Sequence, residues 1–249
     1  MIRRAWFDVL AAVQFLTRLR VPVGPYDPGA LARAVKFFPI VGLLIGLGSA
    51  LLYFLLNPHL QATVVAFVIV GYLVSITGCL HEDGLADAAD GFGGGWDRER
   101  VLAIMRDSRI GTYGAVALIL SLLARVVLIA SLPKMRAEAY LIAAPVLCRW
   151  TALPLSFYLP SARDVSDGQG ARIANFTSLT SLMIGSALTL AIVLPILRFR
   201  AVGPIMASIV ITLVTALYYK RRIGGITGDC FGATNQLTEV AVYLCGVWV

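Results

Sequence analysis

The chain has 249 residues, of which 59% are hydrophobic and only 14% are charged, and its mean hydropathy is +0.83. Soluble domains carry nearer one quarter charged residues, so this composition excludes an ordinary soluble protein and indicates a membrane protein. The formal net charge of +7 is compatible with nucleic-acid binding, but membrane proteins keep Lys and Arg on their cytoplasmic loops, and we interpret this charge as topology with no nucleic-acid partner.

The N-terminal segment 1–36 is more polar than the rest of the chain. Its stretch AWFDVLAAVQFLTRLR at 5–20 contains Asp8, Gln14 and Arg18, which argues against a cleavable signal. The apolar residues recur at helical spacing and predict an amphipathic helix in the membrane interface, although an ordinary packed helix fits the spacing equally well. We assign 1–36 to the cytoplasmic or interfacial side.

Apolar runs fill most of the remaining sequence. A helix needs roughly 20 residues to cross a bilayer, and all but the last run approach this length. We therefore predict one all-α membrane domain over 1–249, a polytopic helix bundle with about seven transmembrane helices plus the N-terminal amphipathic helix. The runs are at 37–56, 61–80, 113–132, 139–159, 178–197, 202–219 and 236–249.

The distribution of charge predicts the orientation of these spans. With the N-terminus in the cytoplasm, the segments on that side hold 15 of the 21 Lys and Arg residues and 12 of the 14 acids. The excess of Lys and Arg follows the positive-inside rule. The excess of acids on the same side places any polar chemistry at the cytoplasmic face. The cytoplasmic segments are 1–36, 81–112, 160–177 and 220–235.

The acidic run HEDGLADAADG at 81–91 is the most informative motif in the sequence. If the helix of the second span continues through it, Asp83, Asp87 and Asp90 are spaced i, i+4, i+7 and lie along one face. Carboxylates at this spacing repel each other, and a hard divalent cation removes the repulsion. Magnesium is bound by a few carboxylates together with substrate phosphates. We therefore predict a Mg²⁺ site on a catalytic loop at 81–112, where the alternative is a solvated acidic loop.

Two neighbours of these aspartates have open roles. Glu82 points away from the shared face, and we include it as an additional metal ligand or base. His81 is compatible with a metal ligand, a general base or a hydrogen-bonded interfacial histidine, and we place it among the substrate-binding candidates.

Basic residues after the acidic run are candidates for binding an anionic substrate. The sequence MRDSRIGTYG at 105–114 contains Arg106 and Arg109, whose guanidinium groups offer planar forks of donors to phosphate. Simple positive flanking of the third span explains them equally well.

The last cytoplasmic segment, 220–235, predicts a second active-site loop. Four glycines surround Asp229 within nine residues, which indicates tight turns or a close approach of backbone to a ligand. We expect Gly225, Thr227 and Asn235 to contact substrate there. A flexible connector is the alternative.

Arg149 lies near the middle of the fourth span, where a charged residue costs on the order of 2.5–3.5 kcal/mol on insertion. It should therefore face the interior of the bundle and either meet an acid such as Glu239 or line a polar cavity. Arg125 in the third span invites the same argument. Structural ion pairs would satisfy both.

Five motifs, taken in this order along the chain, resemble one family. They are FLTRLRVP at 15–22, FFPIVGLLIG at 37–46, GCLHEDGLADAADGFGGG at 78–95, RDSRIGTYG at 106–114 and GGITGDCFGATNQ at 224–236. Together they resemble cobalamin synthase, the family of adenosylcobinamide-GDP ribazoletransferases. Arg163 and DGQG at 167–170 fit the family pattern more loosely, and the family has an acidic residue near Gln236.

The resemblance implies a reaction and its partners. The cobinamide phosphate of adenosylcobinamide-GDP is transferred to α-ribazole or α-ribazole 5′-phosphate, GMP is released, and this completes the nucleotide loop of coenzyme B12. It implies Mg²⁺ as the cofactor and the bacterial inner membrane as the location. A homo-oligomer, or association with other cobalamin-assembly enzymes, is compatible with it.

The resemblance also completes our hypothesis for the site. The predicted metal ligands are Asp83, Asp87, Asp90 and Glu82, with Asp229 as a further catalytic residue. The predicted substrate-binding residues are His81, Arg106, Arg109, Arg149, Gly225, Thr227 and Asn235.

Two other functions are compatible with parts of this pattern. The acidic run is similar in chemistry to that of CDP-alcohol phosphotransferases, but it lacks their DGxxAR segment. A cation-coupled transporter would need acids deep within its spans, whereas here only Glu239 lies inside an apolar run.

Overall fold

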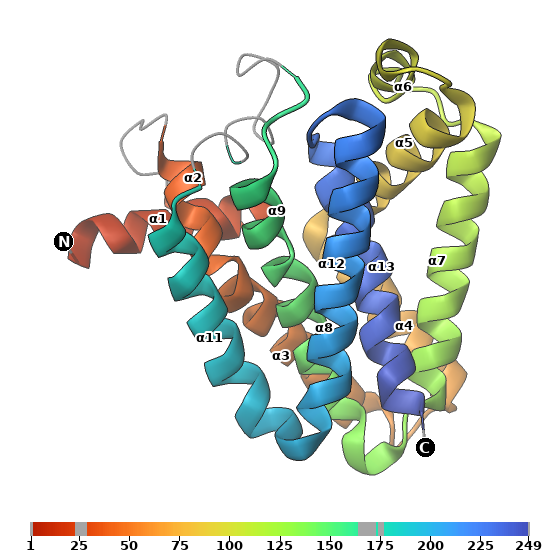
Figure 1. Ribbon diagram of the computed structural model, residues 1–249. Helices are drawn as coiled ribbons and strands as arrows, with labels where there is room; N and C mark the ends of the chain where they lie inside the picture. Colours follow the sequence, from red (N-terminus) through yellow and green to blue (C-terminus); the bar gives the residue numbers. More distant parts are fainter. Residues whose placement is uncertain (1, 23–28, 164–172, 174–176, 249) are drawn as a thin grey trace.

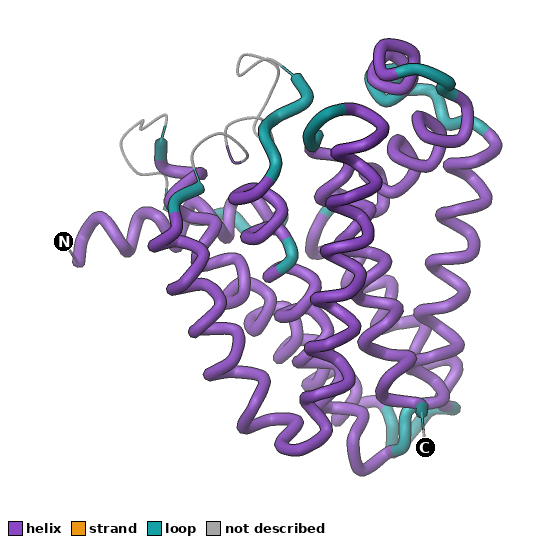
Figure 2. Tube along the Cα trace, viewed as in Figure 1, coloured by secondary structure: helices purple, strands orange, loops and turns teal. Residues whose placement is uncertain are grey.

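The computed structural model describes residues 2–22, 29–163, 173 and 177–248. In these ranges the chain is almost entirely helical, and the one β-bridge, between Ser161 and Ile226, is isolated rather than part of a sheet. Figure 2 shows helices throughout, joined by short connections. The prediction of an all-α fold is confirmed.

Figure 1 labels the α-helices, whereas the short 3₁₀ helices η1 and η3 carry no label there. Their bounds are α1 Ile2–Leu16, α2 Ala30–Ala34, η1 Val35–Phe37, α3 Phe38–Leu56, α4 Ala62–Thr77, α5 Leu80–Gly94, α6 Arg98–Ile104, α7 Thr112–Ser131, α8 Lys134–Trp150, α9 Ala152–Tyr158, α11 Leu179–Leu197, η3 Arg198–Ala201, α12 Val202–Ile223 and α13 Gly228–Val247.

Several helices are suited to cross a membrane. Among the described residues, four helical segments are long and apolar enough, or five if the bent pair α4–α5 is taken as one span. One of the four, Leu179–Ile223, contains α11 and α12, which Figure 1 shows as two legs of a hairpin. The chain is thus a polytopic membrane protein, whereas the predicted number of about seven spans is not confirmed. Large apolar side chains stay exposed on its outer faces, such as Leu51, Phe54, Ile119, Leu120, Leu213 and Leu217.

The central helix of the bundle is α13, which packs against α5, α7, α8 and α12. Its sequence is polar for a membrane helix because its polar side chains face these neighbours instead of lipid. The helix begins at Gly228, where the Thr227 hydroxyl accepts a hydrogen bond from the Cys230 N–H at 3.4 Å. The last predicted span, 236–249, is therefore the second part of a longer helix, and part of the predicted loop 220–235 is helical.

The acidic run lies on a separate helix, not on a continuation of the second span. Gly78 and Cys79 both adopt left-handed backbone conformations, with φ of 63° and 62°, and α5 leaves α4 at a bend of 88°. Glycine takes this conformation readily, whereas cysteine has to be held there by its surroundings. As a result, the segment 81–112 consists mainly of α5 and α6 rather than of the loop that we predicted.

The polar segments gather at one end of the bundle. Figure 1 shows α1, α2, α5, α6 and the α12–α13 turn toward that end, and the α3–α4, α7–α8 and α11–α12 connections at the other. This is the grouping that the distribution of Lys and Arg predicts. We treat α5, which lies beyond the end of α4 at the polar end, as outside the membrane-spanning helices.

Candidate active site

Asp83, Asp87 and Asp90 all lie within α5, so the helical geometry that their spacing requires is present. Their environments differ. Asp83 is exposed, Asp87 is partly buried and Asp90 is buried. In the described part of the chain, the side-chain carboxylates of Asp83 and Asp87 make no hydrogen bond. These two carboxylates are therefore available to a ligand.

Asp90 is engaged differently, at the N-terminus of α7. Its two carboxylate oxygens accept hydrogen bonds from the backbone N–H groups of Gly111 at 2.7 Å and Gly114 at 2.9 Å. A carboxylate at a helix N-terminus is stabilised by the free N–H groups and by the helix dipole. Asp90 thus fixes α7 against α5, and its predicted role as a metal ligand stays a prediction.

A glycine crossing brings Asp229 to the acidic face. A Cβ atom added at Gly84 would lie 3.0 Å from the Asp229 carbonyl oxygen and 3.1 Å from the Gly232 Cα atom, so the backbones of α5 and α13 nearly touch. Small residues allow such close helix contacts in membrane proteins. The crossing sets Asp229, in the first turn of α13, opposite α5.

Asp229 is oriented by two partners. The Arg163 guanidinium donates to its carboxylate at 3.0 Å, and the Thr227 hydroxyl donates to the same oxygen at 3.2 Å. Burial raises the pKa of Asp229, and the positive charge of Arg163 opposes this rise. Thr227 therefore acts on the site through Asp229 and through the start of α13.

The electrostatics of this cluster favour a cation. Burial, followed by the negative charges of Asp229 and Asp83, raises the pKa of Asp87 to about 7. Among the described side chains, no three from His, Cys, Asp and Glu stand close enough together to hold a metal ion. Asp83 and Asp87 form a two-carboxylate set instead, and Mg²⁺ is commonly bound by one or two carboxylates plus the phosphates of a substrate. The residues present fit such an ion.

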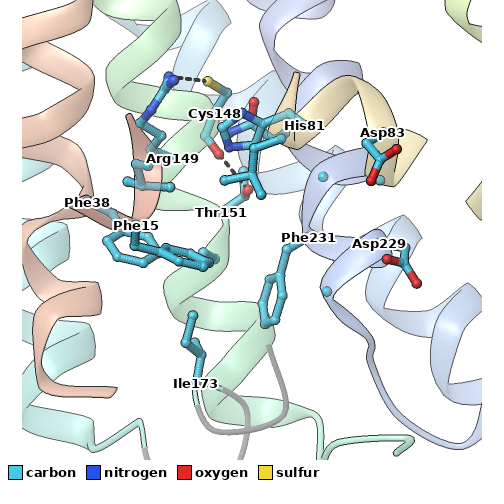
Figure 3. Close-up of a pocket in the computed structure, with 17 residues that line it drawn as sticks. Phe15, Phe38, His81, Asp83, Cys148, Arg149, Thr151, Ile173, Asp229 and Phe231 are labelled. Atoms are coloured by element: carbon cyan, nitrogen blue, oxygen red, sulfur yellow. Dashed lines mark hydrogen bonds between the residues drawn. The ribbon is translucent and has the colours of Figure 1, made fainter. Parts of the chain in front are cut away.

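A cavity of about 190 Å³ adjoins the acidic cluster. Figure 3 shows that its lining is divided, with His81 and Arg149 toward one end and Asp83 and Asp229 along one side. The remaining lining is largely apolar and includes Phe15, Phe38, Ile173 and Phe231. The cavity is thus suited to a ligand with both a flat apolar part and a charged part.

Arg149 supplies the positive charge of this cavity. The side chain is only 3% exposed, and its Nη1 donates to the Pro145 carbonyl oxygen at 3.1 Å. Among the described residues its Nε has no hydrogen-bond partner, and no carboxylate lies within 4 Å of the side chain. Asn235 also lines the cavity, and its buried Oδ1 has no hydrogen-bond partner in the described ranges. Arg149 therefore lines a cavity with a few polar groups instead of pairing with an acid.

The buried acids pair with Arg125 instead. Its guanidinium contacts the Glu82 carboxylate at 2.8 Å and that of Glu239 at 3.8 Å, and Gln236 donates to Glu82 at 3.3 Å. Of the two alternatives for Arg149, an ion pair with Glu239 is therefore not the one found, because Glu239 contacts Arg125. Glu82 is held by Arg125, and its predicted metal role stays a prediction.

The other substrate-binding candidates lie outside this cavity. Arg109 is exposed and pairs with Asp107 at 2.6 Å, and Arg106 lies in the same segment beyond α6. Gly225 packs against the chain at Pro160, where an added Cβ would meet the carbonyl oxygen. Because these three residues do not line the cavity, their predicted contacts with substrate stay predictions. The segment DGQG at 167–170 lies outside the described residues.

Comparison with known proteins identifies the family. The model of the cobalamin-5-phosphate synthase family matches residues 8–247, which include every residue of the candidate site. The chain belongs to this family. The resemblance that the motifs indicate is thereby confirmed.

Curated relatives of the cobalamin-5-phosphate synthase family cover nearly the whole chain. Adenosylcobinamide-GDP ribazoletransferases of Sinorhizobium medicae strain WSM419 and Rhizobium meliloti strain 1021 are 44% and 43% identical, each over 97% of this chain and 96% of the relative. The enzyme of that name from Vibrio cholerae serotype O1 is 38% identical over 94% of this chain and 91% of the relative. No solved structure matches the chain significantly.

Sequence reasoning missed part of the site of this family member. It gave no site role to the three phenylalanines of the cavity, and it mentioned Arg163 only within a loose family pattern. Phe15 and Phe38 belong to the motifs FLTRLRVP and FFPIVGLLIG, so the motifs themselves were a signal. The pairing of Arg163 with Asp229 joins residues far apart in the chain and left no local signal.

Proposed function

We propose that this chain transfers the cobinamide phosphate of adenosylcobinamide-GDP to α-ribazole or α-ribazole 5′-phosphate. A ribose hydroxyl oxygen forms a bond to the cobinamide-linked phosphorus, and the bond from that phosphorus to the oxygen of GMP breaks. The hydroxyl proton goes to a base on the protein, and GMP leaves. The observation that carries the proposal is the family match over residues 8–247.

The proposal includes Mg²⁺ at Asp83 and Asp87. Its support is that neither carboxylate is hydrogen-bonded to a described residue, that the two lie one turn apart on α5, and that the negative charge around Asp87 disfavours its ionisation without a cation. When bound, the ion would neutralise charge on the diphosphate of the donor. Asp90 and Glu82 would act indirectly, since one caps α7 and the other pairs with Arg125.

The remaining residues position the reactants and handle the proton. Phosphoryl transfer depends chiefly on positioning and charge neutralisation, so a rigid cavity beside the carboxylates accounts for much of the catalysis. Arg149, Asn235 and His81 would orient the acceptor. Asp229, whose pKa is raised by burial, would take up the hydroxyl proton, and Arg163 would hold its carboxylate in place.

We further propose that the site faces the cytoplasm from the bacterial inner membrane. The support is the excess of Lys and Arg in the segments that gather at the polar end of the bundle. At that end the site would meet soluble nucleotides, while the apolar outer faces of the helices contact lipid.

A comparison of donors tests this function. The purified protein in detergent, given Mg²⁺ and α-ribazole, should release GMP from adenosylcobinamide-GDP and no CMP from a CDP-linked lipid. Release of CMP alone would favour a CDP-alcohol type of phosphotransferase and contradict the proposal.

A further inference from the structure

A second cavity, of about 260 Å³, lies beside the acidic helix. Cys79, Ala86 and Asp87 line it from α5 and its start, and Leu118 lines it from α7. Successive residues of a helix are rotated by about 100°, which centres the first cavity near Gly84 and the second near Ala86, with Asp83 between them. The two cavities therefore adjoin two different faces of this helix.

Among the residues that the structure describes, Asp83 alone lines both cavities. In an in-line displacement at phosphorus, the attacking and leaving oxygens lie on opposite sides of the transferred group. A phosphorus atom held at Asp83 would have one cavity on each side. The arrangement of the two cavities thus matches what the reaction requires of its two substrates.

The side chains that line the first cavity match the chemical groups of the acceptor substrate. The rings of Phe15, Phe38 and Phe231 offer apolar surface to a flat heteroaromatic base. Two buried atoms, Nε of Arg149 and Oδ1 of Asn235, have no hydrogen-bond partner within the described part of the chain, and they offer a donor and an acceptor to a polar substituent. A ribosylated base that carries a phosphate satisfies all of these groups.

The polar side chains that line the second cavity match the chemical groups of the leaving nucleotide. Asp87 and Ser108 line it together with Asp83, so it offers carboxylates for a metal-bound diphosphate and a hydroxyl donor. Ser108 also belongs to the segment that holds Arg106 and Arg109. Both cavities are smaller than the 300–1,000 Å³ typical of drug-sized ligands, so each encloses only part of its substrate, and the corrin ring of the donor must lie outside them.

We propose that the two substrates reach Asp83 from two different faces of α5. The acceptor occupies the cavity lined by Arg149, and the guanosine diphosphate part of the donor occupies the cavity lined by Cys79 and Ser108. This inference rests on the proposed function, and it adds to it the side from which each substrate binds.

Alkylation of Cys79 tests the assignment without relying on turnover. Cys79 is exposed in the second cavity, Cys148 and Cys230 are buried, and replacing partly exposed Cys245 by serine leaves one reactive thiol. GMP with Mg²⁺ should slow N-ethylmaleimide labelling of Cys79 at least about fivefold, because the bound nucleotide covers the thiol. Saturating α-ribazole 5′-phosphate should leave the labelling rate unchanged.

Any other pattern of protection overturns the inference, whether the acceptor protects Cys79, both ligands protect it equally, or neither does. The same preparation is assayed for GMP release before labelling. Active protein with the wrong protection pattern contradicts the sidedness alone, whereas protein that releases no GMP contradicts the proposed function.

Two variants provide an independent measurement. Arg149→Met should raise KM for α-ribazole 5′-phosphate about tenfold while KM for adenosylcobinamide-GDP stays within about twofold, and Arg149→Lys should recover part of the loss. Ser108→Trp fills the second cavity, so it should raise KM for adenosylcobinamide-GDP while KM for α-ribazole 5′-phosphate stays within about twofold. Equal effects of Arg149→Met on both KM values would contradict the assignment.

Discussion

The carboxylate of Asp87 on α5 is close enough to that of Asp229 on α13 to feel its negative charge. The two helices are brought together where Gly84 contacts Gly232. After burial, the charge of Asp229 is the largest cause of the raised pKa of Asp87. The site is therefore assembled from two helices whose carboxylates disfavour each other's ionisation.

Replacing Asp87 with Asn should remove transfer while the protein still folds. The amide keeps the size of the side chain but lacks the charge that a metal ligand needs, and we expect GMP release to fall by at least about 10²-fold. Glu99→Gln is the matched control, because Glu99 is an exposed acid of the neighbouring α6. A fully active Asp87→Asn protein would contradict the assignment of Asp87 as a metal ligand.

Magnesium affinity should depend on pH through Asp87. Since its pKa in the metal-free protein is raised to about 7, the carboxyl is protonated below that pH, and the ion must displace a proton to bind. The Mg²⁺ concentration for half-maximal GMP release should therefore rise as pH falls from 8 to 6, approaching about tenfold per unit below 7. An unchanged requirement across this range would show that no such proton is displaced.

The α5–α13 crossing should not tolerate a side chain. Gly84→Val would push its side chain into the backbone of Asp229 and Gly232, separate the two helices, and lower GMP release at least about tenfold. Gly71→Val on α4 is the matched control, because a Cβ there meets nothing within 4 Å. Equal activity of the two variants would mean that the crossing does not position Asp229.

Arg125 should be required for stability. Arg125→Met leaves Glu82 and Glu239 buried without a counter-charge, and breaking such a pair typically costs about 3–5 kcal/mol. The melting temperature in detergent should drop sharply, and adding Glu82→Gln and Glu239→Gln should restore most of it. If the double change gives no recovery, the loss comes from packing rather than from unpaired charge.

The sequence predicts the helices well because apolar runs and helical periodicity are local properties. The aspartates of α5 are on one helix as predicted, and the polar segments lie at one end of the bundle as the charge count indicates. The 88° bend was not predictable, because Cys79 in a left-handed conformation has no local signature.

Partnerships between distant residues explain the other differences. Arg125 and Arg149 are equivalent in the sequence, as single charges within apolar runs, and only the packing of α5 and α13 decides that Arg125 receives both carboxylates. Similarly, Asp90 carries the same charge as Asp83, yet its position against α7 commits it to two backbone N–H groups.

The most direct test of the account is the release of GMP from adenosylcobinamide-GDP by the purified protein in detergent, measured with and without Mg²⁺ and with and without α-ribazole. We predict release only when both are present, with one corrinoid product formed for each GMP. Release that is independent of Mg²⁺ would contradict the role of the α5 carboxylates, and release that is independent of α-ribazole would contradict the transfer reaction itself.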